Sequence, residues 1–204
     1  AAYEVDIGRV HTEISELVKA PLLTLSGFGK QDVTETGSSR FCPGQQIIMT
    51  KWAGAAGAAE LAYVNKRSLM KYFPAVYVDE AVEYLWEKTT GESLLSIEKE
   101  IKTAWDMGAR AFHNVTKNGV FGALWEMAEM SHAGLEVNFA AIPARQESIE
   151  ICEQYGVNLY ETDSLGSVLI GTEHGEDLVR RLREEGIPAA IIGRVTDGND
   201  RTIC

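Results

Sequence analysis

The 204-residue sequence is poor in cysteine, proline and positive charge, and it has no long apolar run. Its three cysteines are widely spaced and form no Cys-x-x-Cys pair, so the spacing predicts neither a disulfide framework nor a zinc site. Gly, Thr, Lys or Glu interrupts every apolar run before it reaches the roughly 20 residues that cross a bilayer. The first residues also lack the basic start and apolar middle of a signal peptide. These absences predict a protein of the reducing cytoplasm.

Positively charged residues are outnumbered by negatively charged ones along the chain. Lys and Arg number 19 against 30 Asp and Glu, which gives a formal net charge of -11. Nucleic acids and anionic membranes both require a dense positive surface that neutralises phosphates, so neither is an expected partner. An anionic substrate would need a locally basic pocket or a pocket lined by backbone amides.

What the sequence does contain is a repeated order of strand, glycine turn and helix. Strands are expected at Val5–Ile14, Pro21–Phe28, Gln46–Thr50, Ala111–Val115, Leu135–Phe139, Ser167–Thr172 and Ala189–Val195. Helices are expected at Ala58–Met70, Val76–Lys88, Ser93–Met107, Val120–Ser131, Gln146–Tyr155 and Glu176–Glu185. The polar residues 31–45 are a predicted linker between two domains. The alternation predicts an α+β or α/β layer architecture with helices on one face of a sheet.

One glycine turn lies at the start of the helix expected from Val120. Thr116 and Gly119 precede this helix, whose free backbone N–H groups and dipole favour an anion such as phosphate. An ordinary capped turn explains the same residues, with Thr116 accepting from helix N–H groups and Gly119 in a conformation that other residues resist. Residue physics alone favours the capped turn, and the phosphate site stays open.

A second glycine-rich turn follows the expected strand at Gln46–Thr50. The block from Met49 to Gly57 resembles a phosphate-binding loop, but its Lys51 precedes the glycines, whereas a Walker A loop needs Gly-Lys-Ser/Thr after them. Small residues that let a helix pack tightly on a sheet explain this block equally well. Near the amino terminus, His11 and Glu13 could be ligands, although such residues on a strand more often lie at the surface.

In their order along the chain, these segments resemble the aminoimidazole-ribonucleotide (AIR) synthase-like superfamily, and most closely its hydrogenase-maturation factor branch. The resemblance extends over nearly the whole chain and rests on several short, glycine-based motifs at the family's spacing. Val5–Glu13 is similar to the strand ending in Gly-Gly-His-Thr-Glu that closes the family's amino-terminal nucleotide domain. The other similar pieces are Pro21–Gly29, Ile47–Ala62, His113–Leu124, which matches an Asp-x-Thr-x-Gly-Gly turn and helix, Leu159–Gly171 and Ala189–Val195.

The resemblance implies an α+β carboxy-terminal domain over residues 46–204, with a mixed or antiparallel sheet covered by helices. It implies that residues 1–30 are the last strands of an amino-terminal ATP-binding domain that is otherwise missing from the chain. Family members use ATP and Mg²⁺ to phosphorylate and activate an amide- or carbamoyl-type oxygen. The implied partners are a nucleotide, a small-molecule substrate, and either a homodimer through the missing domain or a separate chain that supplies it.

The resemblance also assigns residues, and the sequence departs from the family at some of them. Phosphate and nucleotide contacts fall to His11, Thr12, Glu13, Asn114, Thr116 and Gly119, and no metal ligand is assigned. The family's paired glycines are here Arg9 and Val10, its Asp is Asn114, and its first turn Gly is Asn118. Asn114 cannot supply the negative charge of a metal ligand or base. A catalytically degenerate ligand- or partner-binding paralogue is therefore the alternative, and this chain alone is expected to be inactive.

The last residue, Cys204, resembles the end of the hydrogenase-maturation factors, which finish in Pro-Arg-Ile-Cys. In that family the terminal thiol is carbamoylated and then dehydrated to a thiocyanate. The chain ends in Thr202-Ile203-Cys204, so the Ile-Cys matches and the Pro is absent. A carrier modified on Cys204 is a second alternative, and it requires an accessible thiol with a depressed pKa.

Overall fold

The structure, a computed structural model, describes residues 8–16, 18–27, 40–85 and 93–204. The chain divides into two compact units, residues 1–36 and residues 37–204, which are described separately. In the described residues no helix combines the length and the apolar character that crossing a membrane requires.

The second unit is built on one six-stranded sheet. Its strands are β1 (Gln46–Thr50), β2 (Ala111–Val115), β3 (Gly134–Val137), β4 (Ser167–Thr172), β5 (Ala189–Thr196) and β6 (Arg201–Ile203). They lie in the order β2-β4-β1-β5-β3-β6. Neighbouring strands are antiparallel except β3 and β6, which are parallel. The predicted α+β fold with a mixed sheet is confirmed.

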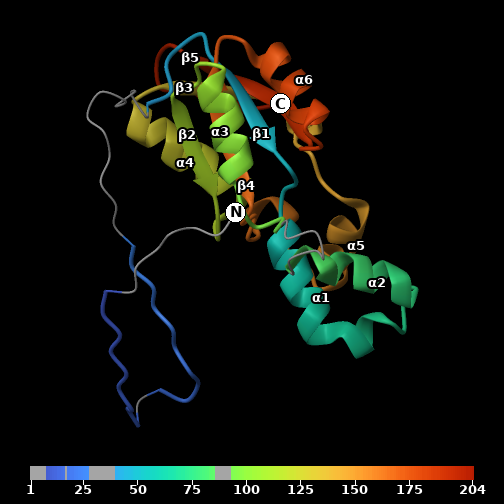
Figure 1. Ribbon diagram of the computed structural model, residues 1–204. Coiled ribbons are helices and arrows are strands. Elements are labelled where there is room, and N and C mark those ends of the chain that lie inside the picture. The colour runs from blue at the N-terminus through green and yellow to red at the C-terminus, as the bar shows by residue number, and fades with distance from the viewer. Residues whose placement is uncertain (1–7, 17, 28–39, 86–92) are drawn as a thin grey trace. The chain divides into compact units, whose positions relative to one another are not determined.

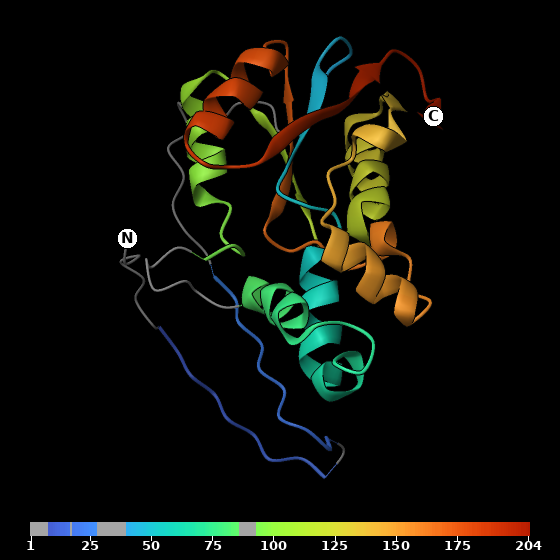
Figure 2. The same cartoon turned by 90° about the vertical axis from the view of Figure 1, so that its right-hand side faces the viewer.

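Helices cover both faces of this sheet, so the expectation of helices on one face was wrong. Helix α4 (Gly119–Ser131) packs against one face, with Ile47 and Met49 of β1 in the same core. Helices α3 (Glu98–Asp106) and α6 (Gly175–Glu184) pack against the other face, around Ile48. Figure 2 shows α4 on one side of the strands and α3 with α6 on the other. Successive strand residues point to opposite faces, so the continuous apolar run of β1 needs a cover on each.

Three further helices form a separate layer below one end of the sheet, as drawn in Figure 1. They are α1 (Ala55–Leu69), α2 (Ala75–Val82) with the 3-10 turn η2 (Glu83–Leu85), and α5 (Gln146–Gln154). Their shared core consists of Ala62, Leu69, Val78, Ala81 and Ile151. The last residues of the helix expected at Val76–Lys88 lie outside the described residues.

Local differences from the expected elements have physical causes. The helix expected at Ser93–Met107 begins only at Glu98, because the carbonyls of Leu94 and Ser96 accept hydrogen bonds from the Lys51 ammonium group. Strand β6 was not predicted, since three residues carry little period-2 signal. Two 3-10 turns complete the domain, η3 (Phe139–Ala141) and η4 (Leu159–Glu161).

The first unit contains no strand over its described residues 8–16 and 18–27, which corrects the strands expected at Val5–Ile14 and Pro21–Phe28. Their apolar side chains are exposed, Ile14 to 98% and Leu25 to 85%. An extended segment becomes a strand only when another strand accepts and donates its backbone hydrogen bonds. The assignment of these residues to an amino-terminal ATP-binding domain stays a prediction.

Candidate functional site

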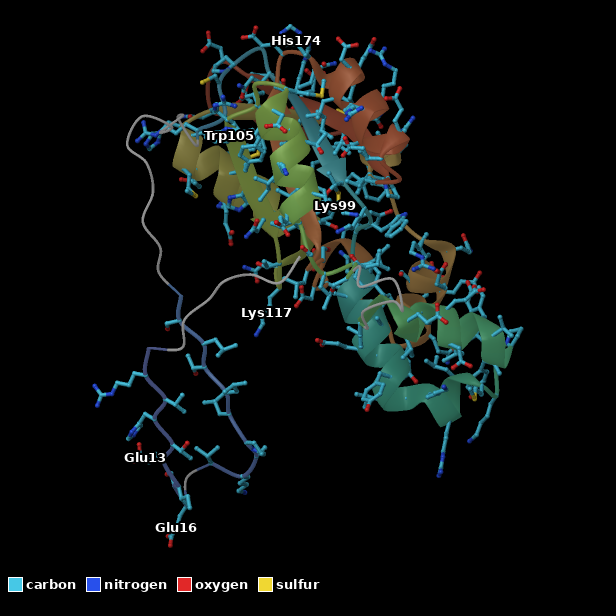
Figure 3. The ribbon with its side chains drawn as sticks, viewed as in Figure 1. Glu13, Glu16, Lys99, Trp105, Lys117 and His174 are labelled. Atoms are coloured by element: carbon cyan, nitrogen blue, oxygen red, sulfur yellow. The ribbon has the colours of Figure 1, made fainter. Side chains whose placement is uncertain are left out.

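The turn between β2 and α4 holds the strongest candidate site. Thr116, Lys117 and Asn118 are exposed, and the amide of Gly119 donates to the Thr116 carbonyl at 2.9 Å. Gly119 has a φ of +63°, and a Cβ there would overlap the backbone carbonyl of Tyr160. Only glycine therefore fits this position without strain. Figure 3 shows Lys117 projecting from this end of the sheet.

The first turn of α4 is left open because Asn118 does not cap it. The Asn118 side chain instead donates from Nδ2 to Glu126 Oε1 at 3.3 Å, and no side-chain cap bond forms. Gly122 makes this possible, since a Cβ at that position would overlap the Asn118 side chain. Among the described residues the amides of Val120 and Phe121 meet no acceptor. Val120 is fully buried, so the amide that a ligand can reach is that of the partly exposed Phe121, at a helix start whose dipole favours an anion.

A polar cluster lies beside this turn on the outer surface. Glu126 of α4 accepts a hydrogen bond from Asn118 on its Oε1 atom. Its other oxygen, Oε2, lies 3.2 Å from Nε2 of His113. Asn114, the next residue on the edge strand β2, is exposed. Thr116 and Gly119, two of the residues assigned from sequence, thus lie in one turn, whereas Asn114 alternates with His113 along β2 and so faces the opposite side of the sheet from α4. The described residues contain no cluster of three His, Cys, Asp or Glu side chains suited to a metal ion.

The second glycine turn, between β1 and α1, is closed by the protein itself. Its Gly54 amide donates to Ser164 Oγ at 2.7 Å, and its Gly57 amide donates to the Asp163 carbonyl at 2.8 Å. A Cβ at Gly54 or Gly57 would overlap Leu159 or Thr162. The loop of residues 159–166 thus fills the space that a phosphate would need. Of the two interpretations of this block, the structure supports tight packing.

Lys51 is buried in this turn and is not available to a phosphate. Its Nζ donates to the carbonyls of Leu94 at 2.9 Å, Ser96 at 2.5 Å and Gly166 at 3.1 Å. Glu100 Oε1 lies 2.6 Å from the same Nζ, and both side chains are more than 90% buried. Because the three ammonium hydrogens are used by the carbonyls, the Glu100 contact is an ion pair without its own hydrogen bond. This pair was missed from sequence.

Tyr84 lies next to the buried ion pair. Its hydroxyl donates to the Leu165 carbonyl at 3.2 Å, so it belongs to the same anchored loop. Burial, and after it the negative charge of Glu100, raise the pKa of the Tyr84 phenol. The hydroxyl therefore stays protonated and serves as a structural donor.

His11, Thr12 and Glu13 belong to the first unit, where all three are exposed. Figure 3 labels Glu13 on this segment. That these three residues and the β2–α4 turn bind one nucleotide stays a prediction.

The terminal cysteine is held in the sheet, at the edge opposite β2. The Cys204 amide donates to the Val137 carbonyl at 2.9 Å, and its carbonyl accepts from the Phe139 amide at 2.8 Å. A shallow pocket of about 370 Å³ adjoins it, lined in part by Asn138 and Arg194. Five strand spacings separate β2 from β6, roughly 24 Å. The structure therefore separates Cys204 from the β2–α4 turn.

The three cysteines are free thiols of different character. Cys42 and Cys204 are exposed, and Cys152 is buried in α5. Burial raises the pKa of the Cys152 thiol to about 11. A thiol held protonated in this way is a poor nucleophile, so Cys152 is structural.

Comparison with known proteins assigns the described sheet domain. The profile of the family "AIR synthase related protein, C-terminal domain" matches residues 43–203. The carbamoyl dehydratase HypE of Rhodobacter capsulatus is 30% identical over 91 residues, which are 43% of this chain and 27% of that protein. The selenide, water dikinase of Methanococcus maripaludis is 24% identical over 189 residues, covering 85% of this chain and 54% of the relative.

Solved structures share the fold. The hydrogenase maturation protein HypE of E. coli superimposes with a TM-score of 0.61 at 21% identity, covering 82% of this chain and 48% of that one. A structure of the hydrogenase maturation protein HypE in complex with ATP gives a TM-score of 0.53 at 19% identity, and the match covers 79% of this chain and 45% of that one. The chain thus spans about half the length of these proteins.

Proposed function

The chain belongs to the AIR synthase related protein family, and from that premise we propose that it is the carboxy-terminal part of an ATP-dependent enzyme that activates an amide- or carbamoyl-type oxygen. In the proposed reaction the substrate oxygen attacks the γ-phosphorus of ATP, the bond to the bridging β–γ oxygen breaks, and ADP leaves. The phosphorylated oxygen can then depart in a later step. A carbamoyl dehydratase, a dikinase and an ATP complex among the relatives support this chemistry.

The observation that carries the proposal is the open start of α4. Thr116 offers an exposed hydroxyl, and the amide of the partly exposed Phe121 offers an N–H group with no acceptor among the described residues, whereas Val120 is fully buried. Gly119 lets the turn close against the Tyr160 carbonyl, and the exposed Lys117 adds positive charge beside the exposed Thr116. These groups fit phosphate oxygens, which are bound by backbone amides at helix starts.

The same residues fit Mg²⁺ poorly by themselves. Asn114 and Thr116 offer neutral oxygens, and the carboxylate of Glu126 is engaged by His113 and Asn118. Mg²⁺ is usually held by one or two carboxylates together with substrate phosphates. We infer that this domain binds the phosphates, and that any Mg²⁺ is held by carboxylates elsewhere. His11, Thr12 and Glu13 would contact the nucleotide from the first unit.

Calorimetric titration with ATP and Mg²⁺ tests the proposal, on this chain alone and mixed with the amino-terminal half of an ATP-binding relative. Thr116→Val is expected to weaken ATP binding by roughly tenfold, because a hydrogen bond to a charged phosphate is lost. Thr202→Val is the matched control, since Thr202 is an exposed threonine on β6 at the other edge of the sheet. Equal affinities of the two variants, or no binding in any sample, would refute the phosphate site.

The degenerate paralogue remains the second candidate, and Asn114 is the observation that favours it. An amide stands where the family has a carboxylate, in an exposed position that can accept either side chain. Asn114→Asp is expected to increase Mg²⁺-dependent ATP binding if the site has lost a metal ligand. Unchanged binding in this variant would count against the degenerate interpretation. The carrier role of Cys204 and the homodimer through an amino-terminal domain stay predictions without a supporting contact.

A further inference from the structure

The loop of residues 159–166 supports the β2–α4 turn from outside. The amide of Ser164, a fully buried residue, donates to the Thr116 carbonyl at 3.3 Å. Tyr160 places its carbonyl against Gly119, where there is no room for a Cβ. Two backbone groups of the loop thus hold the turn in place, so a shift of the loop would displace Thr116 together with its exposed hydroxyl.

The other end of this loop is anchored by Lys51. Its Nζ donates to the Gly166 carbonyl at 3.1 Å, only two residues after Ser164. The same Nζ donates to the carbonyls of Leu94 and Ser96 in the segment before α3. Gly166 has a φ of +97°, and a Cβ there would overlap the Leu94 carbonyl, so the two segments lie in close contact. The buried ammonium group therefore ties the loop to the segment before α3.

Tyr84 provides a second anchor beside the first. This residue is only 1% exposed, and its hydroxyl donates to the Leu165 carbonyl at 3.2 Å. Both anchors bind backbone carbonyls within two residues of Ser164. In the part of the chain that the structure describes, Lys51 and Tyr84 form no hydrogen bond with the β2–α4 turn itself. Any effect that they have on the turn therefore passes through the loop.

We propose that Lys51 is a positioning residue for the proposed phosphate site and acts through the loop of residues 159–166. The contacts run from Nζ to the Gly166 carbonyl, back along two residues to Ser164, and from the Ser164 amide to the Thr116 carbonyl. A turn that is already held in its binding geometry loses less conformational freedom when a ligand binds. The inference rests on the proposed function and names the residue that keeps its site in shape.

A double variant separates positioning from stability. Lys51→Met with Glu100→Leu removes the buried ion pair without leaving an isolated charge, so the domain should stay folded. The Gly166 carbonyl loses its donor, and ATP affinity measured by calorimetry with Mg²⁺ should fall roughly fivefold. The matched control is Lys66→Met with Asp79→Leu, which removes the same two charges from a half-exposed pair and should bind ATP as the wild type does. Wild-type affinity in the Lys51 double variant would overturn the proposal.

Amide hydrogen exchange tests the coupling without nucleotide. In the Lys51 double variant the amides of Ser164 and Gly119, which both donate to Thr116, should exchange roughly tenfold faster because the loop opens more often. The Leu135 amide, bonded to the Asp200 carbonyl, should keep its rate. Unchanged exchange at Ser164 and Gly119 would overturn the proposal. A wild-type chain that binds no ATP would instead refute the proposed function, on which the inference depends.

Tyr84→Phe decides the case in which the double variant does not fold. This change removes one hydroxyl and leaves the aromatic ring, which lies edge-on to Trp52, and the Lys51–Glu100 pair in place. The loop loses its bond at Leu165, so ATP affinity should fall roughly twofold and the Ser164 amide should exchange faster. If neither quantity changed, the loop would not transmit to the turn and the proposal would be wrong.

Discussion

At the scale of single residues, Lys51 shows how a charge can be structural in a place that suggests ligand binding. It stands at the end of β1 before a glycine turn, with a φ of +53° that is rare for a residue with a Cβ. The surrounding carbonyls and Glu100 hold the ammonium group inside the protein. The strained backbone is compensated by contacts to three segments, namely the loop before α3, α3 itself and the start of β4.

The buried pair gives a stability prediction. Lys51→Met should lower the free energy of unfolding by about 3–5 kcal/mol, because Glu100 is left buried and unpaired. Replacing both residues, as Lys51→Met with Glu100→Leu, should recover most of the loss, since no isolated charge remains. Urea unfolding followed by circular dichroism measures both.

A matched surface pair provides the control for this measurement. Lys66 and Asp79 form an ion pair in which both side chains are close to half exposed. Lys66→Met is therefore expected to cost at most about 1 kcal/mol. If Lys51→Met cost no more than Lys66→Met, the structural role of the buried pair would be wrong.

At the scale of elements, the two strand–turn–helix units look alike in sequence and differ in the structure. Both have a strand, a glycine with positive φ, Gly54 or Gly119, and a helix. At α1 the amides of Gly54 and Gly57 donate to Ser164 and Asp163 of a distant loop, whereas at α4 the Gly119 amide donates to the Thr116 carbonyl of its own turn. The deciding residues lie about a hundred positions from Gly54, so local pattern could not distinguish a packed turn from a candidate anion site.

Ser164 tests this distinction. Ser164→Ala should lower stability by about 1–3 kcal/mol, because it leaves the buried Gly54 amide without an acceptor. It should leave ATP affinity unchanged, since the α1 turn is closed to ligands. Thr116→Val should do the reverse, with little effect on unfolding and a clear effect on binding. Chemical denaturation and calorimetry on the two variants would contradict this assignment if Ser164→Ala weakened ATP binding more than Thr116→Val.

Most elements of the sheet domain were predictable from the sequence, and the reasons are local. The bounds of β2 and β4 were predicted as found, because each is an apolar run ended by polar or glycine residues. Strand β6 and the late start of α3 were not, since one depends on pairing with β3 and the other on bonds from Lys51. The candidate site was predictable as a turn, but its open amides depend on the contact of Asn118 with Glu126.

At the scale of the whole molecule, the two candidate chemistries lie at opposite edges of one sheet. The β2–α4 turn is at the β2 edge and Cys204 extends the β6 edge. The backbone of Cys204 is hydrogen-bonded to Val137 and Phe139, so its thiol cannot reach the turn of its own domain while these bonds are intact. Any reaction that joins the two therefore requires the release of β6 or a site on another molecule.

The division of the chain into two units predicts that folding and nucleotide binding can be separated. Among the residues that the structure describes, the clusters of buried apolar side chains are built from residues 41–195, and the apolar residues of the first unit are exposed. Removing residues 1–36 should therefore change the free energy of unfolding by no more than about 0.5 kcal/mol.

The proposed roles of His11 and Glu13 predict that the same deletion weakens ATP binding. The double variant His11→Ala with Glu13→Ala in the full chain should reproduce that loss. A deletion that unfolds the domain would show that residues 1–36 belong to its core, and equal ATP affinity in all three proteins would remove His11 and Glu13 from the site.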